Sequence, residues 1–195
     1  AALHMGATLA DVRTGLEGLA SVPGRLEPID CGQPFPVFVD YAHTDDALRR
    51  VVDSLKSITN GRVLCVFGAG GDRDRSKRPL LGEAASHADF AIVTSDNPRT
   101  EAPHGIIEEV VAGFPPGFAS FHVEPDRRQA IEFALAEAQP GDCVLIAGKG
   151  HESDQIVGTD RFPFDDRLVT REILEPQLSR ETQREATAHS ATTTN

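Results

Sequence analysis

Four short polar segments carry the residues that could do chemistry, and each of them follows an apolar run. They are Asp-Tyr-Ala-His-Thr at 40–44, a glycine- and arginine-rich stretch at 68–79, a segment containing Asp-Asn-Pro-Arg at 94–101, and Gly-Lys-Gly-His-Glu at 148–152. If the apolar runs are strands, all four segments lie at their carboxyl ends. In an open α/β sheet that edge is where ligands bind, so the four segments predict one shared site.

The first two segments suit anion or nucleotide binding, although each also has a purely structural interpretation. Asp40 and His43 could contact a nucleotide or substrate, or the segment could simply cap the next helix through Thr44 or Asp45. The 68–79 segment has three glycines, which allow backbone N–H groups to approach an anion, and four basic residues in six positions. It is neither a Walker A motif nor a GxGxxG fingerprint, and a solvated run of charges is the alternative.

The other two segments suit recognition of an amino acid. The Asp-Asn-Pro-Arg sequence at 96–99 is a good turn, but it also places a carboxylate, an amide and a guanidinium together. Arg99 could hold a carboxylate through two parallel hydrogen bonds. In the 148–152 segment, glycines bring the backbone close to a ligand and Glu152 could accept a hydrogen bond from an ammonium group. An ordinary helix start is the structural alternative there.

Histidines and cysteines do not show the spacing of a metal site. His151-Glu152 is not followed by a second histidine, because Gln155 stands where a zinc motif needs it. Cys65 and Cys143 lie inside apolar runs, which predicts buried thiols, and the three cysteines are widely spaced. We therefore expect no metal site in this chain and a reducing, cytoplasmic setting.

The composition excludes some function classes. A chain of 195 residues suffices for one domain with tails. The formal charge of −11 and the pI of about 5.0 argue against nucleic-acid binding, which needs a basic surface. No apolar run reaches the roughly 18 residues of a membrane-spanning helix. The N-terminus lacks the pattern of a signal peptide. We expect no membrane association.

Strand and helix patterns alternate about five times along the chain. Short apolar runs predict strands at 37–40, 62–67, 90–94, 118–123 and 143–147. Amphipathic stretches predict helices at 47–58, 77–87, 104–113 and 126–138. This alternation predicts an α/β fold of the Rossmann-like kind, with a mostly parallel sheet flanked by helices on both faces.

The two ends of the chain have other patterns. Residues 1–21 are expected to be helical until Pro23-Gly24 interrupts them. Residues 155–164 predict a hairpin that turns at 158–160, and residues 165–167 open a last helix that ends near 174. The Thr- and Ala-rich end of the chain is expected to be disordered.

Taken together, the four segments resemble the C-terminal domain of the Mur ligase family. The matching motifs are Asp-Tyr-Ala-His-Thr, Phe-Gly-x-Gly-Gly-Asp-Arg-Asp-x-x-Lys-Arg at 67–78, Asp-Asn-Pro-Arg and Gly-Lys-Gly-His-Glu. The resemblance covers about residues 1–174 and includes a Pro-Gly-Arg-Leu-Glu hinge at 23–27. It implies the last helix of a central ATP-binding domain and the hinge at 1–24, the C-terminal domain at 25–176, and a tail at 177–195.

The resemblance implies part of an ATP- and Mg²⁺-dependent amide ligase of peptidoglycan biosynthesis. In such enzymes, ATP phosphorylates the glutamate carboxylate of UDP-MurNAc-L-Ala-D-Glu, and a diamino acid attacks the acyl phosphate. Asp-Asn-Pro-Arg is typical of members that use meso-diaminopimelate. A buried Arg99 would pair with the far carboxylate of diaminopimelate and would be left unpaired by L-lysine, which lacks that group.

Residue roles carry over position by position. By resemblance, the diaminopimelate-binding residues are Arg73, Asp96, Asn97, Arg99, Gly148 and Glu152. The residues on the ATP side are Arg25, Asp40 and His43. Lys77 and Arg78 are expected to brace their loop. Asp45 replaces the proline that follows Asp-Tyr-Ala-His-Thr in the family, which loosens the turn but keeps a capping side chain.

The chain lacks other parts that the family needs for catalysis. The Gly-Lys-Thr/Ser phosphate loop, the Mg²⁺ ligands, the modified lysine and the UDP-binding domain are absent from this sequence, so we expect no ligation by the chain alone. A non-catalytic, free-standing amino-acid-binding module remains an alternative, as does a ligase for another diamino acid such as L-lysine. The last two motifs argue against a folylpolyglutamate or cyanophycin synthetase. The missing GxGxxG argues against a nicotinamide-dependent dehydrogenase.

Overall fold

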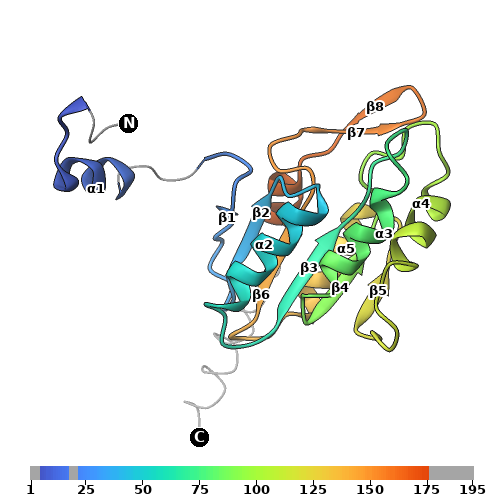
Figure 1. Cartoon of the computed structure of the whole chain (residues 1–195), viewed down its shortest axis with the longest axis horizontal. Coiled ribbons are helices and arrows are strands. Elements are labelled where there is room, and N and C mark those ends of the chain that lie inside the picture. The colour runs from blue at the N-terminus through green and yellow to red at the C-terminus, as the bar shows by residue number, and fades with distance from the viewer. Residues whose placement is uncertain (1–4, 18–21, 176–195) are drawn as a thin grey trace, which may run out of the picture.

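The structure is a computed structural model that describes residues 5–17 and 22–175 (Figure 1). The predicted helix at the N-terminus lies only partly within these ranges, where it is α1 (Leu9–Glu17). This helix stands apart from the sheet (Figure 1). The predicted tail at 177–195 lies outside the described residues. Within the described ranges, no helix is long and apolar enough to cross a membrane.

A six-stranded sheet forms the centre of the molecule and confirms the predicted α/β architecture. Its spatial order is β1 (Glu27–Pro28), β2 (Val37–Asp40), β6 (Cys143–Ala147), β3 (Val63–Phe67), β4 (Phe90–Val93) and β5 (Phe121–Val123). All neighbouring pairs are parallel except β1 with β2, which is a short antiparallel edge. The sequence pattern predicted the five parallel strands but not β1.

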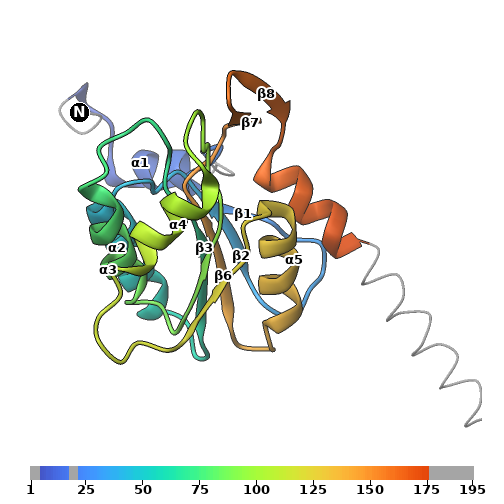
Figure 2. The ribbon, with the colours of Figure 1, turned by 90° about the vertical axis from the view of Figure 1, so that its right-hand side faces the viewer.

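Helices cover both faces of the sheet, as Figure 2 shows. One face packs against α2 (Asp45–Lys56), α3 (Lys77–Ala85) and α4 (Pro103–Val111). The other packs against α5 (Arg127–Glu137) and the helical residues 166–175. Every residue of β3 and β6 is buried, because successive side chains enter the two core layers in turn.

Local capping fixes where α2 begins and ends. The Thr44 hydroxyl accepts a hydrogen bond from the Ala47 amide at 3.3 Å, as expected for an N-cap. At the other end of α2, the Ser57 amide donates to the carbonyls of Asp53 and Leu55 and closes the helix. The prediction that α2 continues to Ile58 was wrong: Ile58 follows the cap and is 74% exposed.

A second, two-stranded sheet lies above the carboxyl edge of the main sheet. It is the predicted hairpin, formed by β7 (Asp154–Val157) and β8 (Asp160–Pro163) (Figure 1). Gly158 occupies its turn with φ +62°. The Arg99 amide donates to the Ile156 carbonyl at 3.0 Å, and the Gly158 amide donates to the Arg99 carbonyl at 2.7 Å. The hairpin therefore holds the Asp-Asn-Pro-Arg loop in place.

Candidate functional site

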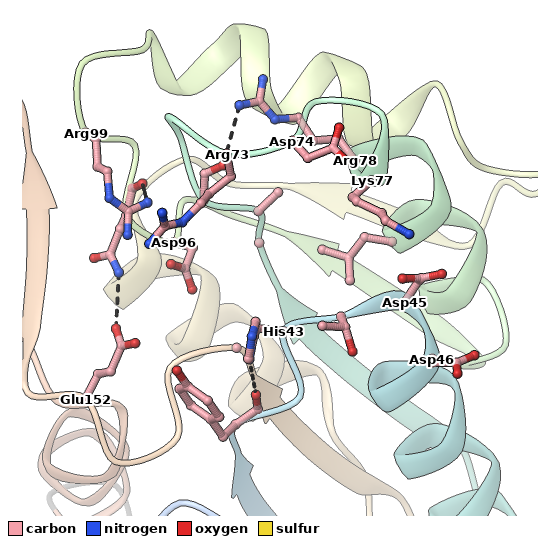
Figure 3. A pocket seen from close by; sticks show the side chains of 18 residues that line it. His43, Asp45, Asp46, Arg73, Asp74, Lys77, Arg78, Asp96, Arg99 and Glu152 are labelled. Carbon is pink, nitrogen blue, oxygen red and sulfur yellow. Dashed lines mark hydrogen bonds between the residues drawn. The ribbon is translucent and has the colours of Figure 1, made fainter.

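The four polar segments meet at the carboxyl edge of the sheet around a cavity of about 770 Å³ (Figure 3). They follow β2, β3, β4 and β6. Of the nine residues singled out by the sequence, seven line this cavity: His43, Arg73, Asp96, Asn97, Arg99, Gly148 and Glu152. Arg25 and Asp40 do not. The cavity is also lined by Thr44, which is the N-cap of α2, by Asp45, which is the first residue of that helix, and by Lys77.

The glycine-rich loop lies tightly against the Asp-Asn-Pro-Arg loop. The Gly71 amide donates to the Asn97 carbonyl at 2.9 Å. A Cβ atom at Gly71 would lie 1.9 Å from the carbonyl oxygen of Pro98, so only glycine allows this approach. The sequence suggested that the glycines bring backbone N–H groups to an anion. At Gly71 the amide is instead used to join the two loops.

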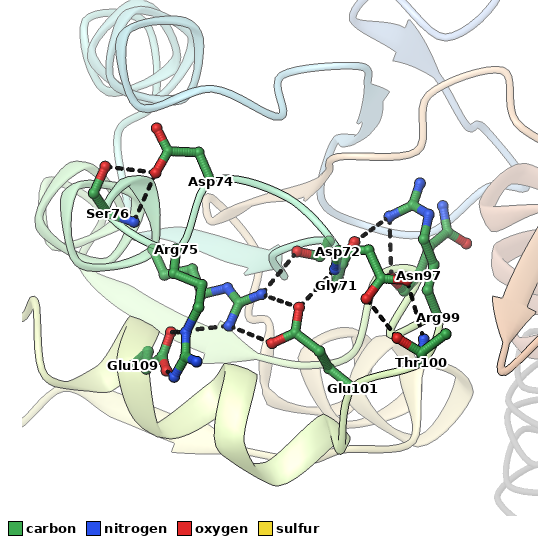
Figure 4. A network of polar contacts seen from close by, with 12 residues as sticks. Gly71, Asp72, Asp74, Arg75, Ser76, Asn97, Arg99, Thr100, Glu101 and Glu109 are labelled. Carbon is green, nitrogen blue, oxygen red and sulfur yellow. Dashed lines mark hydrogen bonds and ion pairs between the residues drawn. The ribbon is translucent and has the colours of Figure 1, made fainter.

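A buried arginine braces the same loop through Glu101 and Glu109, the two carboxylates labelled beside that loop in Figure 4. Arg78 is 2% exposed and donates both terminal nitrogens to Glu101, at 2.9 and 2.7 Å, and one of them to Glu109. Glu101 also accepts the Asp72 amide at 2.6 Å. The Arg78 guanidinium and this amide lower the pKa of Glu101 to about 2. Charge-assisted hydrogen bonds thus fix the loop that carries Arg73 into the cavity.

Arg99 presents one edge of its guanidinium to the cavity. The residue has φ +51°, a conformation stabilised by the backbone pairing to the hairpin. Its Nη1 donates to the Gly71 carbonyl at 2.7 Å, and the group extends towards Arg73 and Asp96 (Figure 3). Among the described residues, nothing accepts a hydrogen bond from Nε or Nη2. This free edge can take a carboxylate in the bidentate geometry.

Asn97, Lys149 and Glu152 form a fixed polar cluster beside it. The Asn97 side-chain nitrogen donates to Glu152 Oε2 at 3.1 Å. The Asn97 side-chain oxygen accepts from Lys149 Nζ at 3.2 Å and from the Ile156 amide at 2.9 Å. Lys149 itself is completely buried. Because the amide oxygen of Asn97 has two donors, the orientation of this amide is determined by its surroundings.

Asp96 brings a carboxylate to the cavity that has no hydrogen-bond partner among the described residues. Burial raises the pKa of this carboxyl above its ordinary value of 3.8, while the charges of Arg127 and Lys149 lower it in part. Gly148 faces it with φ +113°, and a Cβ atom there would lie 3.0 Å from Asp96 Oδ2. The glycine thereby leaves room next to a carboxylate that can receive an ammonium group.

The charges at this end of the cavity match an amino acid. Two guanidinium groups, of Arg73 and Arg99, stand with two carboxylates, of Asp96 and Glu152. A ligand that carries carboxylates and ammonium groups can pair with both kinds of side chain at once. Among the described residues, no group of three or more His, Cys, Asp or Glu side chains could hold a metal ion.

The three residues expected on the nucleotide side surround Tyr41 or brace its loop. The Arg25 guanidinium lies over the Tyr41 ring at 4.8 Å from its centroid. His43 Nδ1 is 2.9 Å from the Tyr41 carbonyl oxygen. Asp40 is 7% exposed, and its two carboxylate oxygens accept the Leu26 and Ala42 amides at 2.7 and 2.8 Å. In this structure Asp40 therefore joins the backbone at Leu26, just before β1, to the carboxyl end of β2.

Sequence reasoning did not assign two residues that organise the site. Lys149 stands between two glycines, and nothing in that setting indicates that its ammonium group is buried. Arg127 is 1% exposed and binds Asp166 through two hydrogen bonds of 2.8 and 2.7 Å. It also donates to the Ala147 carbonyl at 2.9 Å, just before the Gly-Lys-Gly-His-Glu loop. Its partner is 39 residues away, so no local pattern could reveal the pair.

Comparisons with known proteins identify the family of this chain. Residues 24–150 match the family described as Mur ligase, glutamate ligase domain. A protein of Gloeobacter violaceus named UDP-N-acetylmuramoyl-L-alanyl-D-glutamate--2,6-diaminopimelate ligase is 50% identical over 182 residues. That match covers 92% of this chain and 37% of the relative. A protein of the same name from Caldanaerobacter subterraneus is 49% identical, with 87% of this chain and 35% of the relative covered.

A solved structure of a protein with this name has the same fold. It is 42% identical, with a TM-score of 0.76, and the match covers 90% of this chain and 36% of that one. The chain thus spans little more than a third of the length of these proteins. The family match extends over more than half of the 195 residues and includes all four cavity loops up to Gly150. The chain therefore belongs to the Mur ligase family, as a glutamate ligase domain of that family.

Proposed function

We propose that this chain is the amino-acid-binding domain of an ATP-dependent ligase that adds meso-diaminopimelate to UDP-MurNAc-L-Ala-D-Glu in peptidoglycan synthesis. The observation that carries the proposal is that two guanidinium groups and two carboxylates line one end of the same cavity. Diaminopimelate has two carboxylates and two ammonium groups. Two relatives of this chain, which are 50% and 49% identical to it, have names that include 2,6-diaminopimelate.

Within the proposal, the six predicted residues divide by charge. Arg99, through its free Nε and Nη2 edge, and Arg73 bind carboxylate. Asp96 and the free oxygen of Glu152 receive ammonium, with Asn97 donating beside them. Gly148 provides the space between its own backbone and Asp96. The far end of diaminopimelate, with its carboxylate and ammonium group, is held here, and the amino group of the other end is directed out of the cavity as the nucleophile. Lysine aligned in the same way would bring only its ε-ammonium group to this end.

Discrimination against L-lysine rests on Arg99 in this proposal. Arg99 is half-buried in the structure, and lysine would leave its Nε and Nη2 edge without a carboxylate. An unpaired charged donor costs more than an absent neutral contact, so the site should reject lysine strongly.

ATP and Mg²⁺ are the cofactors of the proposed reaction, and their main binding groups belong to the parts of the enzyme outside this sequence. Arg25 and His43, which flank Tyr41, are the groups of this chain proposed to face the nucleotide. Asp40 contributes indirectly, because it holds the Leu26 amide and so the position of Arg25. The proposed setting is the cytoplasm, where ATP and the nucleotide-linked precursor are found together.

Calorimetric titration of the chain tests the binding part. We expect meso-diaminopimelate to bind at least tenfold more tightly than L-lysine, and Arg99→Met to remove this preference. Arg161→Met is the matched control, since Arg161 lies on the hairpin but is 68% exposed and pairs with Asp154. Equal affinity for both amino acids in the wild-type chain would contradict the assignment of Arg99.

A chimera tests the catalytic part. Residues 22–175 replace the matching segment of the Gloeobacter violaceus relative, and ADP release is measured with UDP-MurNAc-L-Ala-D-Glu and each amino acid. Diaminopimelate-dependent ADP release supports the ligase. Tight binding of diaminopimelate by the chain, combined with an inactive chimera that is folded, would instead favour a non-catalytic amino-acid-binding module.

A further inference from the structure

The most unusual charged group next to the cavity is a lysine that no solvent reaches. Lys149 is 0% exposed, and its ammonium group has three acceptors: the Asn97 side-chain oxygen at 3.2 Å, Glu152 Oε2 at 3.4 Å and the Asp154 carbonyl. An ammonium group has three hydrogens, so each one has a partner. Burial of a lysine is otherwise unfavourable, and complete pairing is what makes it tolerable.

We propose that Lys149 is a positioning residue that determines which atoms of Asn97 and Glu152 face the ligand. Lys149 occupies the side-chain oxygen of Asn97, so the NH₂ group is the part of that amide that can face a ligand. By holding Glu152 Oε2, it leaves Oε1 as the oxygen available to a ligand. The inference rests on the proposed function and adds the residue that sets the polarity of the cavity wall.

The geometry supports a role beyond simple bracing. Asn97 and Glu152 belong to loops 55 residues apart, and Lys149 contacts both side chains. The third bond, to the Asp154 carbonyl, fixes the start of the hairpin that also pairs with Arg99. One ammonium group thus links the two ligand-facing side chains to the strand that positions the guanidinium.

The Lys149 charge also acts on the neighbouring carboxylates. Asp96 and Glu152 line the same cavity, and the charge of Glu152 raises the pKa of Asp96. Lys149 counteracts this by lowering the pKa of Asp96, although burial still raises it overall. A neutral residue at this position would therefore raise the pKa of Asp96 further and would release the Asn97 amide and the Glu152 carboxylate from their orientations.

NMR of the ligand-free chain tests the positioning directly. In ¹⁵N-labelled wild-type protein, the Lys149 ammonium protons should exchange slowly enough to be observed and should show contacts to Asn97. Lys56 is the internal control: it also bonds a carbonyl and a carboxylate, each at 3.0 Å, but its side chain is 40% exposed. Exchange of the Lys149 ammonium as fast as that of Lys56 would overturn the proposal, and no variant is needed for this test.

Substitution then tests the consequence for binding. Lys149→Met keeps the length of the side chain but removes the charge and its donors. We expect the Asn97 side-chain NH₂ signals to move and the affinity for meso-diaminopimelate to fall by about tenfold or more, the effect of losing a charge-assisted contact. Lys56→Met should change neither. If Lys149→Met unfolds the chain, Lys149→Gln retains a neutral donor and is measured in its place.

The outcomes separate this inference from the proposed function. If wild-type chain and chimera both fail to bind diaminopimelate, the proposed function fails, while the ammonium exchange and the Asn97 signals still decide the role of Lys149. If diaminopimelate binds but a folded Lys149→Met variant binds equally well with unchanged Asn97 signals, the proposed function stands and the positioning role is refuted.

Discussion

The buried pair of Arg127 and Asp166 offers the most demanding test of how the site is supported. Both side chains are inaccessible to solvent, and two hydrogen bonds of 2.8 and 2.7 Å join them. Arg127→Met would leave Asp166 as a buried carboxylate without a counter-ion. Breaking a buried pair from one side costs about 3–5 kcal/mol. That is a large part of the roughly 5–15 kcal/mol that stabilises a typical domain.

Urea unfolding followed by circular dichroism measures this effect. Arg128→Met is the matched control on the same helix, because Arg128 and Glu172 are 47% and 60% exposed and their ion pair should contribute no more than about 1 kcal/mol. The double variant Arg127→Met/Asp166→Leu removes the isolated charge. It should recover at least about 2 kcal/mol relative to Arg127→Met alone, since an apolar replacement of both partners avoids their desolvation.

The double variant also separates stability from function. Arg127 donates to the Ala147 carbonyl, directly before Gly148, so its loss should weaken diaminopimelate binding even where folding is recovered. The reasoning is refuted if Arg127→Met costs no more free energy of unfolding than Arg128→Met. It is refuted equally if the double variant is no more stable than the single one.

Further predictions follow from the titrating groups. The folded state raises the pKa of Asp96 above its ordinary value of 3.8, so the ionised group lowers the free energy of unfolding as the pH rises above 3.8. Asp96→Asn should therefore raise the free energy of unfolding at pH 7 and weaken diaminopimelate binding. A decrease in stability would contradict this. Arg78 is the main cause that lowers the pKa of Glu101 to about 2, so Glu101 stabilises the fold above pH 4.5 and loses this contribution between pH 4.5 and 2. Wild type and Glu101→Gln should therefore differ in thermal unfolding temperature at pH 6 and converge near pH 2. A difference that persists near pH 2 would disprove this role of Glu101. Burial raises the pKa of the Cys65 thiol to about 12 and that of the Cys143 thiol to about 11. A thiol reagent at pH 8 should therefore modify Cys31 alone in the native chain and all three thiols in urea. Rapid modification of more than one native thiol would be inconsistent with the described core.

Much of the fold could be predicted because its central strands are buried on both faces. The runs around Cys65 and Cys143 are short, continuous and apolar, and only a doubly covered sheet accommodates such strands. The four polar segments then had to meet, since the carboxyl ends of parallel strands share one edge. This is why the seven cavity residues could be expected together before their distances were known.

The remaining features depend on contacts between distant residues. The ion pair of Arg127 with Asp166 and the brace of Arg78 with Glu101 join separate elements, and a lone charged residue gives no sign of its partner. Nothing in the sequence indicated that Lys149 is buried, because lysine is rarely buried unless it is paired. Strand β1 was missed because two residues carry no period. Ile58 was wrongly included in the predicted helix, because this apolar residue continues the helical pattern beyond the C-cap of α2.

The most direct test of the central claim is an NMR titration of the ¹⁵N-labelled chain with meso-diaminopimelate, with L-lysine as the control, up to millimolar ligand. We expect selective shifts of the Arg73, Asn97, Arg99 and Gly148 signals with diaminopimelate only. Equal shifts with lysine would contradict the role of Arg99. If these signals do not shift with diaminopimelate, either in the chain or in the chimera with the rest of the enzyme, the assignment of the cavity as the binding site is contradicted.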